Sequence, residues 1–350
     1  MDTLTHALSG ALVARATWNK NTSRLSLRQR TLVGFLATAF PDIDYIIRLF
    51  SSDFIFYLNH HRGITHSLVM LPLWALVLAF LFSKLLRPKT DWRMLYPVCC
   101  IGIGLHIGGD VITSYGTMIF APFSDWRASL DTTFIIDPVF TGIIVASLLL
   151  SFLLTRKQGV AAIGSIVLVA YVGLQAWAHN EAVKLGERAA GDYLWQEATV
   201  SALPQPLSPF NWKIVVEHEE HYHIGMVRLF GEATKADNSG SFLSVTGSAY
   251  YQPENIQWER LYRYGENRHL AEDIWLAWMH DTLDGYRRFA RFPRLIENRK
   301  YAKDCYWFSD LRFELPHRDS SPLFTVGLCE KVLGKLHRPA RTFHYGPGLD

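Results

Sequence analysis

The sequence predicts an α-helical membrane domain followed by a soluble α+β domain. The 350 residues are 49% hydrophobic and only 19% charged, whereas about a quarter of the residues are charged in soluble globular proteins. Residues 67–180 contain long apolar runs, and residues 181–350 have the polar, aromatic-rich composition of an ordinary soluble domain. The net charge of +3 is too small to indicate nucleic-acid binding, so we expect none.

The membrane domain, residues 1–182, should contain four or five transmembrane or broken helices after a short helix at 4–16. A membrane span needs about 20 mostly apolar residues. Three segments meet this length: 67–86, 134–154 and 160–178. Two others are compromised: 31–50 contains PDID, and 95–120 contains His106 and Asp110. Polar groups in hydrocarbon are costly unless they are satisfied, so we expect function in these two segments.

Basic residues predict how the helices are oriented. Lysines and arginines gather at 15–30, 84–93 and 156–157, which places these three segments in the cytoplasm. The intervening segments 51–66 and 121–133, and everything after about residue 180, then lie outside. We therefore expect a multi-pass protein with an extracytoplasmic C-terminal domain.

The C-terminal domain, residues 211–350, should combine strands with one helical region. Apolar alternation predicts strands at 212–217, 222–230, 241–251, 306–315 and 323–329, and helical spacing covers 270–292. The proline-rich stretch LPQPLSP predicts a linker at 183–210. Cys305 and Cys329 lie outside the apolar runs and are the two cysteines that could pair; the spacing leaves open whether they do.

Histidines and aspartates near the N-terminus favour a metal site. One histidine lies in DTLTHALSG, two aspartates form PDID, and HHRGITHS holds three histidines. His106 and Asp110 are four residues apart and would share one face of a helix. The predicted orientation brings all these groups to the extracytoplasmic side at similar depth. The candidate ligands are His6, Asp42, Asp44, His61, His66, His106 and Asp110, with His60, Asp131 and Asp137 as further candidates.

Imidazole and carboxylate together suit a first-row divalent ion, with zinc expected first and manganese second. Seven donors exceed the three that a catalytic zinc takes from protein, which favours two ions. In a hydrolase, Asp44 or Asp110 would transfer protons and Arg62 would stabilise developing negative charge. Each motif alone has a simpler interpretation. His106 could be a hydrogen-bonded residue of the helix interior, PDID could stop and cap a helix, and HHRGITHS could be an interfacial loop. Because all these motifs are predicted to lie on the same side of the membrane, the metal site is favoured.

Other motifs carry less weight. VEHEEHYHIG lacks the HExxH spacing of zinc proteases, and its strand-turn-strand context favours a polar hairpin. The sequence contains no P-loop, dinucleotide-binding fingerprint or GxSxG motif.

The motifs DTLTHALSGAL, FLATAFPDIDYI, HHRGITHSL, GLHIGGDVITSYGT and APFSDWRASLDTTFIIDPVFT occur in this order over residues 1–180. They resemble the membrane-bound metal-dependent hydrolase family described as LexA-regulated, or YdjM-like. This resemblance implies a bacterial inner-membrane protein with all seven candidate ligands at motif positions. The layout is also similar to zinc-dependent phospholipases C and single-strand nucleases, which implies phosphate-ester hydrolysis with zinc.

We therefore predict a hydrolase of the inner membrane that acts at the outer leaflet. Its expected partners are the bilayer and a phosphoester or other ester of a lipid-linked or envelope molecule. Two alternatives stay open: a non-enzymatic envelope or stress protein with a structural metal, and a transporter. An open coordination position would favour the enzyme over a structural site, and a midplane site reached from both sides would favour the transporter.

Overall fold

The computed structural model describes most of the chain in two compact units. The described residues are 1–19, 25–47, 53–86, 90–154, 157–193, 195, 197–231, 248–266, 271–296, 305–316 and 323–329. Unit 1 comprises Met1–Phe50 and His60–Ala178, and unit 2 comprises Ser51–Asn59 and His179–Asp350. This division agrees with the predicted fold class, in which a helical membrane domain precedes a domain with β-structure.

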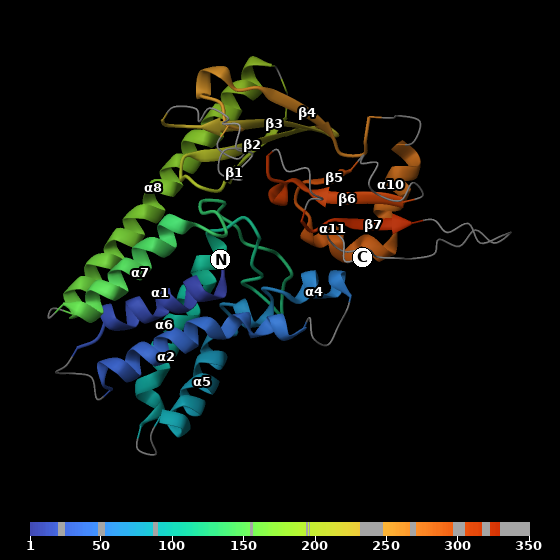
Figure 1. Cartoon of the computed structure of the whole chain (residues 1–350). Helices are drawn as coiled ribbons and strands as arrows, with labels where there is room; N and C mark the ends of the chain where they lie inside the picture. Colours follow the sequence, from blue (N-terminus) through green and yellow to red (C-terminus); the bar gives the residue numbers. More distant parts are fainter. Residues whose placement is uncertain are drawn as a thin grey trace, which may run out of the picture. The chain divides into compact units, whose positions relative to one another are not determined.

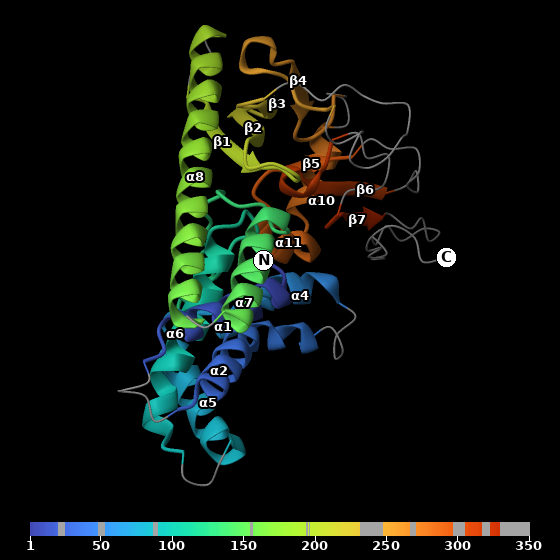
Figure 2. The same cartoon turned by 60° about the vertical axis from the view of Figure 1, so that its left-hand side comes forward.

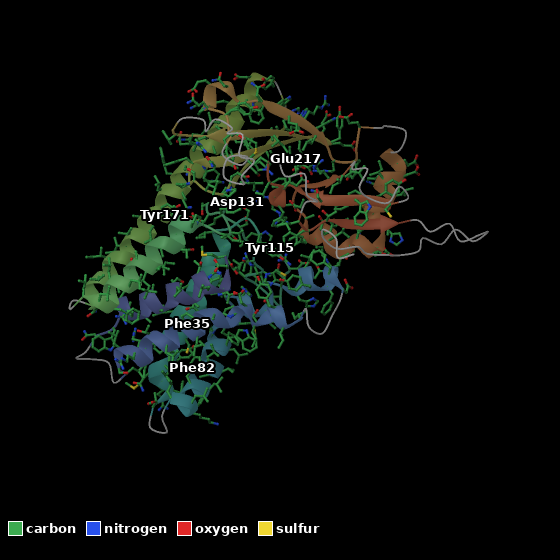
Figure 3. The ribbon with its side chains drawn as sticks, in the orientation of Figure 1. Phe35, Phe82, Tyr115, Asp131, Tyr171 and Glu217 are labelled. Carbon is green, nitrogen blue, oxygen red and sulfur yellow. The ribbon has the colours of Figure 1, made fainter. Side chains whose placement is uncertain are left out.

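Unit 1 is helical (Figure 1). Its elements are α1 (Thr3–Ala16), α2 (Leu27–Ala39), η1 (Phe40–Ile46), η2 (Ile64–His66), α5 (Leu71–Leu86), α6 (Trp92–Val111), α7 (Pro138–Leu153) and the first part of α8 (Lys157–Asp192). One apolar cluster lies among α2, α5 and α6, and a second among α1, α7 and α8. Phe82 belongs to the first cluster, and Phe35 packs against the second (Figure 3).

Local sequence signals explain where several of these helices begin. The Asp2 side chain accepts a hydrogen bond from Thr5 N and caps α1. Ser26 and Gln29 form a reciprocal capping box at the start of α2. Asp137 caps α7, whose first residue is a proline, as expected for a helix N-terminus.

Fewer helices reach spanning length than the sequence suggests. Among the described residues, α6 and Gln158–Asp192 of α8 are long and apolar enough to cross a membrane. The bent pair Phe54–His66 and Leu71–Leu86 would count as a third span, and α7 is shorter. Figure 2 shows α8 as one continuous helix with α7 beside it. Of the two compromised segments, 31–50 is divided between α2 and η1 at Phe40, whereas 95–120 contributes most of α6, which ends at Val111 and has spanning length.

Unit 2 contains two antiparallel sheets. The first has the order β1 (Thr199–Pro204), β2 (Asn211–His218), β3 (His221–Arg228), β4 (Trp258–Tyr262). The second has the order β5 (Pro293–Leu295), β6 (Cys305–Asp310), β7 (Val326–Cys329). The remaining helical elements are α4 (Phe54–His60), η3 (Pro253–Asn255), α10 (Ala271–Met279), η4 (Asp281–Leu283), α11 (Asp284–Phe289) and η5 (Leu311–Phe313).

Several element boundaries in this half differ from the prediction. The segment 183–210 is not a linker. Its first part continues α8 to Asp192, and β1 then forms a strand because its backbone groups hydrogen-bond along the edge of β2. The helical region 270–292 is interrupted at His280, which caps η4 with its side chain. The strand expected at 306–315 ends at Asp310, where the Asp310 carboxylate accepts from Arg312 N and starts η5. Most of the strand expected at 241–251 lies outside the described residues.

The close contact between α1 and α2 generates a stability prediction. A Cβ at Gly10 would lie 2.4 Å from the Gly34 carbonyl oxygen and 2.0 Å from Thr38 Oγ1, distances that real Cβ contacts do not reach. We expect Gly10→Ala to destabilise the protein by about 2 kcal/mol, because the packed helices must separate. Thermal unfolding of the purified protein measures this.

Gly142→Ala is the matched control, since a Cβ at this helical glycine meets nothing within 4 Å. Alanine favours a helix over glycine by about 1 kcal/mol, so this variant should be as stable as the parent or more so. Equal melting temperatures for the two variants would contradict the packing argument.

Candidate metal centre

Four side-chain atoms from η1, η2 and α6 converge in the interior of unit 1. They are Asp42 Oδ1, His66 Nε2, His106 Nε2 and Asp110 Oδ2, and all four residues are buried. Their separations are 3.0 Å (His66–His106), 3.3 Å (His66–Asp110), 3.4 Å (His106–Asp110), 3.5 Å (His106–Asp42) and 3.6 Å (His66–Asp42). A zinc ion with bonds of about 2.0 Å to four tetrahedral ligands places those ligands about 3.3 Å apart. The two imidazole nitrogens therefore lie at metal-ligand spacing from each other and from both carboxylates, and Asp42, His66 and His106 form one grouping that could hold an ion.

The unsatisfied groups in this cluster also suit a cation. Asp42 Oδ2 and Asp110 Oδ2 are buried and have no hydrogen-bond partner among the described residues. Two imidazole nitrogens only 3.0 Å apart repel each other if both present lone pairs and nothing positive lies between them. Buried carboxylates likewise require compensating charge. The residues present thus fit a divalent ion.

The far nitrogens of the two central histidines are held so that Nε2 faces the cluster. His106 Nδ1 lies 2.6 Å from the Thr38 carbonyl oxygen, which can only accept, so Nδ1 carries the proton and Nε2 presents its lone pair. His66 Nδ1 lies 3.0 Å from Thr65 Oγ1 and 3.4 Å from Asp44 Oδ2. Contacts of this kind orient metal-binding histidines in proteins.

Asp44 lies behind the cluster rather than among its four atoms. Its Oδ1 is 3.1 Å from His61 Nδ1, and its Oδ2 accepts a hydrogen bond of 2.9 Å from the backbone N–H of Arg62. Arg62 has φ 57°, an uncommon conformation for a residue with a side chain. Asp44 therefore fixes the conformation of the HHRGITHS segment and, through it, the position of His66.

The second carboxylate oxygen of Asp110 is surrounded by nitrogen donors. His6 Nε2 lies 3.0 Å away, Arg62 Nη2 2.8 Å away and the amino group of Met1 2.6 Å away. The His6 ring also stacks on His106, with centroids 3.8 Å apart. His6, His106 and Asp110 form a second grouping in which one ion could be held.

The short helix η1 reverses the usual distribution of polar and apolar residues. Asp42 and Asp44 are buried, whereas Ile43 and Tyr45 are 52% and 43% exposed. Apolar side chains that face outward and acids that face inward are expected where the surroundings are lipid and the polar residues serve a function.

Three further candidates lie apart from these groupings. His60 is exposed at the end of α4. Asp131, labelled in Figure 3, is buried at φ 52° and accepts from Ser129 Oγ at 2.5 Å. Asp137 Oδ1 caps α7, and its Oδ2 accepts from Tyr171 and Gln175 at 2.9 and 2.7 Å. These contacts give Asp137 a structural role in joining α7 to α8.

Several supporting groups could not be predicted from the sequence. The Thr38 carbonyl, the Thr65 hydroxyl and Thr113 Oγ1, which accepts from Arg62 Nη1 at 3.1 Å, all contact site residues. Only Thr65, beside His66 in ITHS, had a sequence signal. The predicted hairpin at VEHEEHYHIG is confirmed as β2–β3, and burial lowers the pKa of His223 to about 4.

A helical domain with apolar spans and a buried histidine–aspartate cluster defines a membrane protein with a candidate metal centre. Comparison with known proteins identifies the family: the chain belongs to the YdjM inner membrane protein family, whose model matches residues 1–182. The resemblance to the YdjM-like family is thereby confirmed.

One relative is the uncharacterized protein YfhP of Bacillus subtilis (strain 168), which is 31% identical over 141 residues. The match covers 39% of this chain and 42% of YfhP, less than half of either protein. No solved structure matches the chain.

Proposed function

We propose that this inner-membrane protein is a metal-dependent hydrolase whose ion is held by Asp42, His66, His106 and Asp110. The positions of the two histidines carry the proposal: their Nε2 atoms lie 3.0 Å apart, and each lies 3.3–3.6 Å from an oxygen of both carboxylates. Zinc is the first candidate ion and manganese the second, because both accept mixed imidazole and carboxylate ligands. When bound, such an ion would activate water and polarise the bond to be cleaved.

A second ion remains a prediction. His6 and Asp110 Oδ1 are the donors available for it, together with His106. However, Arg62 Nη2 and the Met1 amino group already lie within 2.8 Å of Asp110 Oδ1, and they supply positive charge there. One ion at the four-atom site therefore has more support than two.

The surrounding side chains suit a negatively charged substrate. Arg62 is buried, and its Nε has no hydrogen-bond partner among the described residues, so a donor remains for a phosphate or oxyanion. Asp110 Oδ2 has no hydrogen-bond partner among the described residues and lies beside both histidines, which makes Asp110 a better ligand than proton carrier. Asp44, hydrogen-bonded to His61, is the better candidate to hold a proton.

An exposed aromatic loop near the site favours a substrate from the membrane. Phe123 and Trp126 are 83% and 56% exposed, and Trp126 stacks on Phe120. The same loop is bonded to the residues after His66, because Leu68 N donates to the Ile119 carbonyl at 3.0 Å. Aromatic side chains are enriched at membrane interfaces. We therefore propose that the substrate is a phosphoester or other ester of a lipid or envelope molecule at the outer leaflet.

Two alternatives make different demands on the site. Four protein ligands are also the number in a closed structural zinc site, which would suit a non-enzymatic envelope protein. The enzyme instead needs an ion with a fifth or sixth position for water. A transporter is less favoured because Asp110 lies in the last turn of α6 and not near its middle.

Metal content tests the ligand set. His66→Ala and His106→Ala should each lose most of the bound zinc or manganese, because removal of one of four ligands disrupts the polyhedron. Elemental analysis of the purified protein measures the ratio of metal to chain. His60→Ala is the matched control and should keep the metal of the parent, since His60 lies outside both donor groupings. Full occupancy in the His66 and His106 variants would refute the site.

Turnover tests the enzyme. Purified protein with added zinc or manganese should cleave an aryl phosphate, phosphodiester or carboxyl ester. Asp44→Asn should reduce the rate by roughly two orders of magnitude with the fold retained, the loss expected when a proton-handling group is removed. If a broad ester panel shows no metal-dependent turnover and X-ray absorption finds a four-coordinate closed ion, the structural alternative is correct.

The location of the C-terminal domain has its own test. Cys305 is disulfide-bonded, and its register partner on the neighbouring strand is Cys329. Disulfides persist in oxidising compartments such as the periplasm, which supports the orientation proposed from the basic segments. A C-terminal reporter that is active only in the periplasm should therefore be active. Activity of a cytoplasm-only reporter at the same position would invert the topology.

A further inference from the structure

Lys213 occupies a core position in the first sheet of unit 2. Residues 211–216 of β2 are all buried, and Lys213 is only 4% exposed. Its cross-strand partner is Met226, and Val215 and Ile224 occupy the next paired position on the same face. Strand alternation would place an apolar residue here, and a buried ammonium is unfavourable unless it is paired. The position therefore requires a physical explanation.

The hydrogen-bond partners of Lys213 are neutral. Its Nζ donates to the backbone carbonyl of Leu311 at 2.9 Å and to that of Glu314. The Glu314 carboxylate is held by Arg294, at 2.9–3.1 Å, and by Ser309. Burial lowers the pKa of Lys213 to about 8, so the side chain is still mostly charged at neutral pH. Lys213 thus keeps a positive charge whose direct partners carry none.

Lys213 lines a cavity of about 560 Å³. That volume falls within the range of about 300–1,000 Å³ typical of small-molecule sites. Ile224, Met226, Ala249, Trp258 and Leu261 supply apolar walls. Among the charged and polar lining residues, Gln257 and Glu259 are exposed, Arg294 and Glu314 are partly buried, and Lys213 is buried.

We propose that this cavity binds an anionic amphiphile, with its carboxylate or phosphate group on Lys213 and its apolar body against Ile224, Met226 and Leu261. An anion beside Lys213 would supply the negative charge that its two hydrogen-bond partners do not carry. The lining carboxylates do not oppose this, because Glu314 is paired with Arg294 and Glu259 is exposed to solvent. The site lies wholly within unit 2 and does not depend on the metal centre.

Calorimetric titration of the full chain in phosphatidylcholine nanodiscs tests the proposal. The probes are hexyl phosphate, hexanoate and hexylamine, with empty nanodiscs subtracted and metal removed by EDTA so that the metal centre does not contribute. Saturable binding of either anion at one per chain supports the site, and the preferred anion identifies the head group. Absence of binding by both anions, or equal binding of hexylamine, overturns it.

Two variants assign the binding to this cavity. Lys213→Met should weaken anion binding at least tenfold, which is about 1.4 kcal/mol, but it also leaves two carbonyls without a donor. Ala249→Phe should fill the cavity and weaken binding similarly without removing any bond of Lys213. Lys184→Met is the control, because Lys184 is 55% exposed on α8 and binding should be unchanged. Parental affinity in either correctly folded cavity variant overturns the proposal.

Discussion

The compensation of the buried Asp110 carboxylate is the interaction on which unit 1 depends. Asp110 is fully buried, and an uncompensated charge in that position would be strongly destabilising. Its oxygens contact His6 and the Met1 amino group from the N-terminal segment, Arg62 and His66 from the HHRGITHS segment, and His106 from its own helix. Segments far apart in sequence are therefore held together by one charge, and the same contacts create the candidate metal centre.

Close helix packing and site chemistry are linked in this unit. A Cβ at Gly102 would lie 2.9 Å from Thr38 Oγ1, so the glycine lets α6 approach α2. That approach brings the Thr38 carbonyl to His106 Nδ1 and fixes the tautomer of the ring. The close approach that Gly102 allows therefore helps to determine which nitrogen of His106 faces the cluster.

The sequence was sufficient for the fold class and the family, and it also predicted the histidines and aspartates that the structure brings together in the candidate site. The spacing of His106 and Asp110 on a helix and the PDID motif indicate metal ligands from the sequence alone. The different positions of Asp42 and Asp44 could not be predicted, because they depend on the tight turns of η1. The strands β1, β4 and β5 were missed because short edge strands are specified by their partners more than by their own alternation. The unusual position of Lys213 could not be predicted for a related reason: a lysine in a strand is unusual only if that strand is buried on both faces, and the sequence does not show this.

The four central donor atoms all come from the segment between Asp42 and Asp110, within the first third of the chain. All four therefore lie inside the region that the family model matches, residues 1–182. That region ends inside α8, the helix whose Tyr171 and Gln175 contact Asp137. None of the four donors lies beyond α8, so a change to the C-terminal domain would remove no donor atom of the candidate centre.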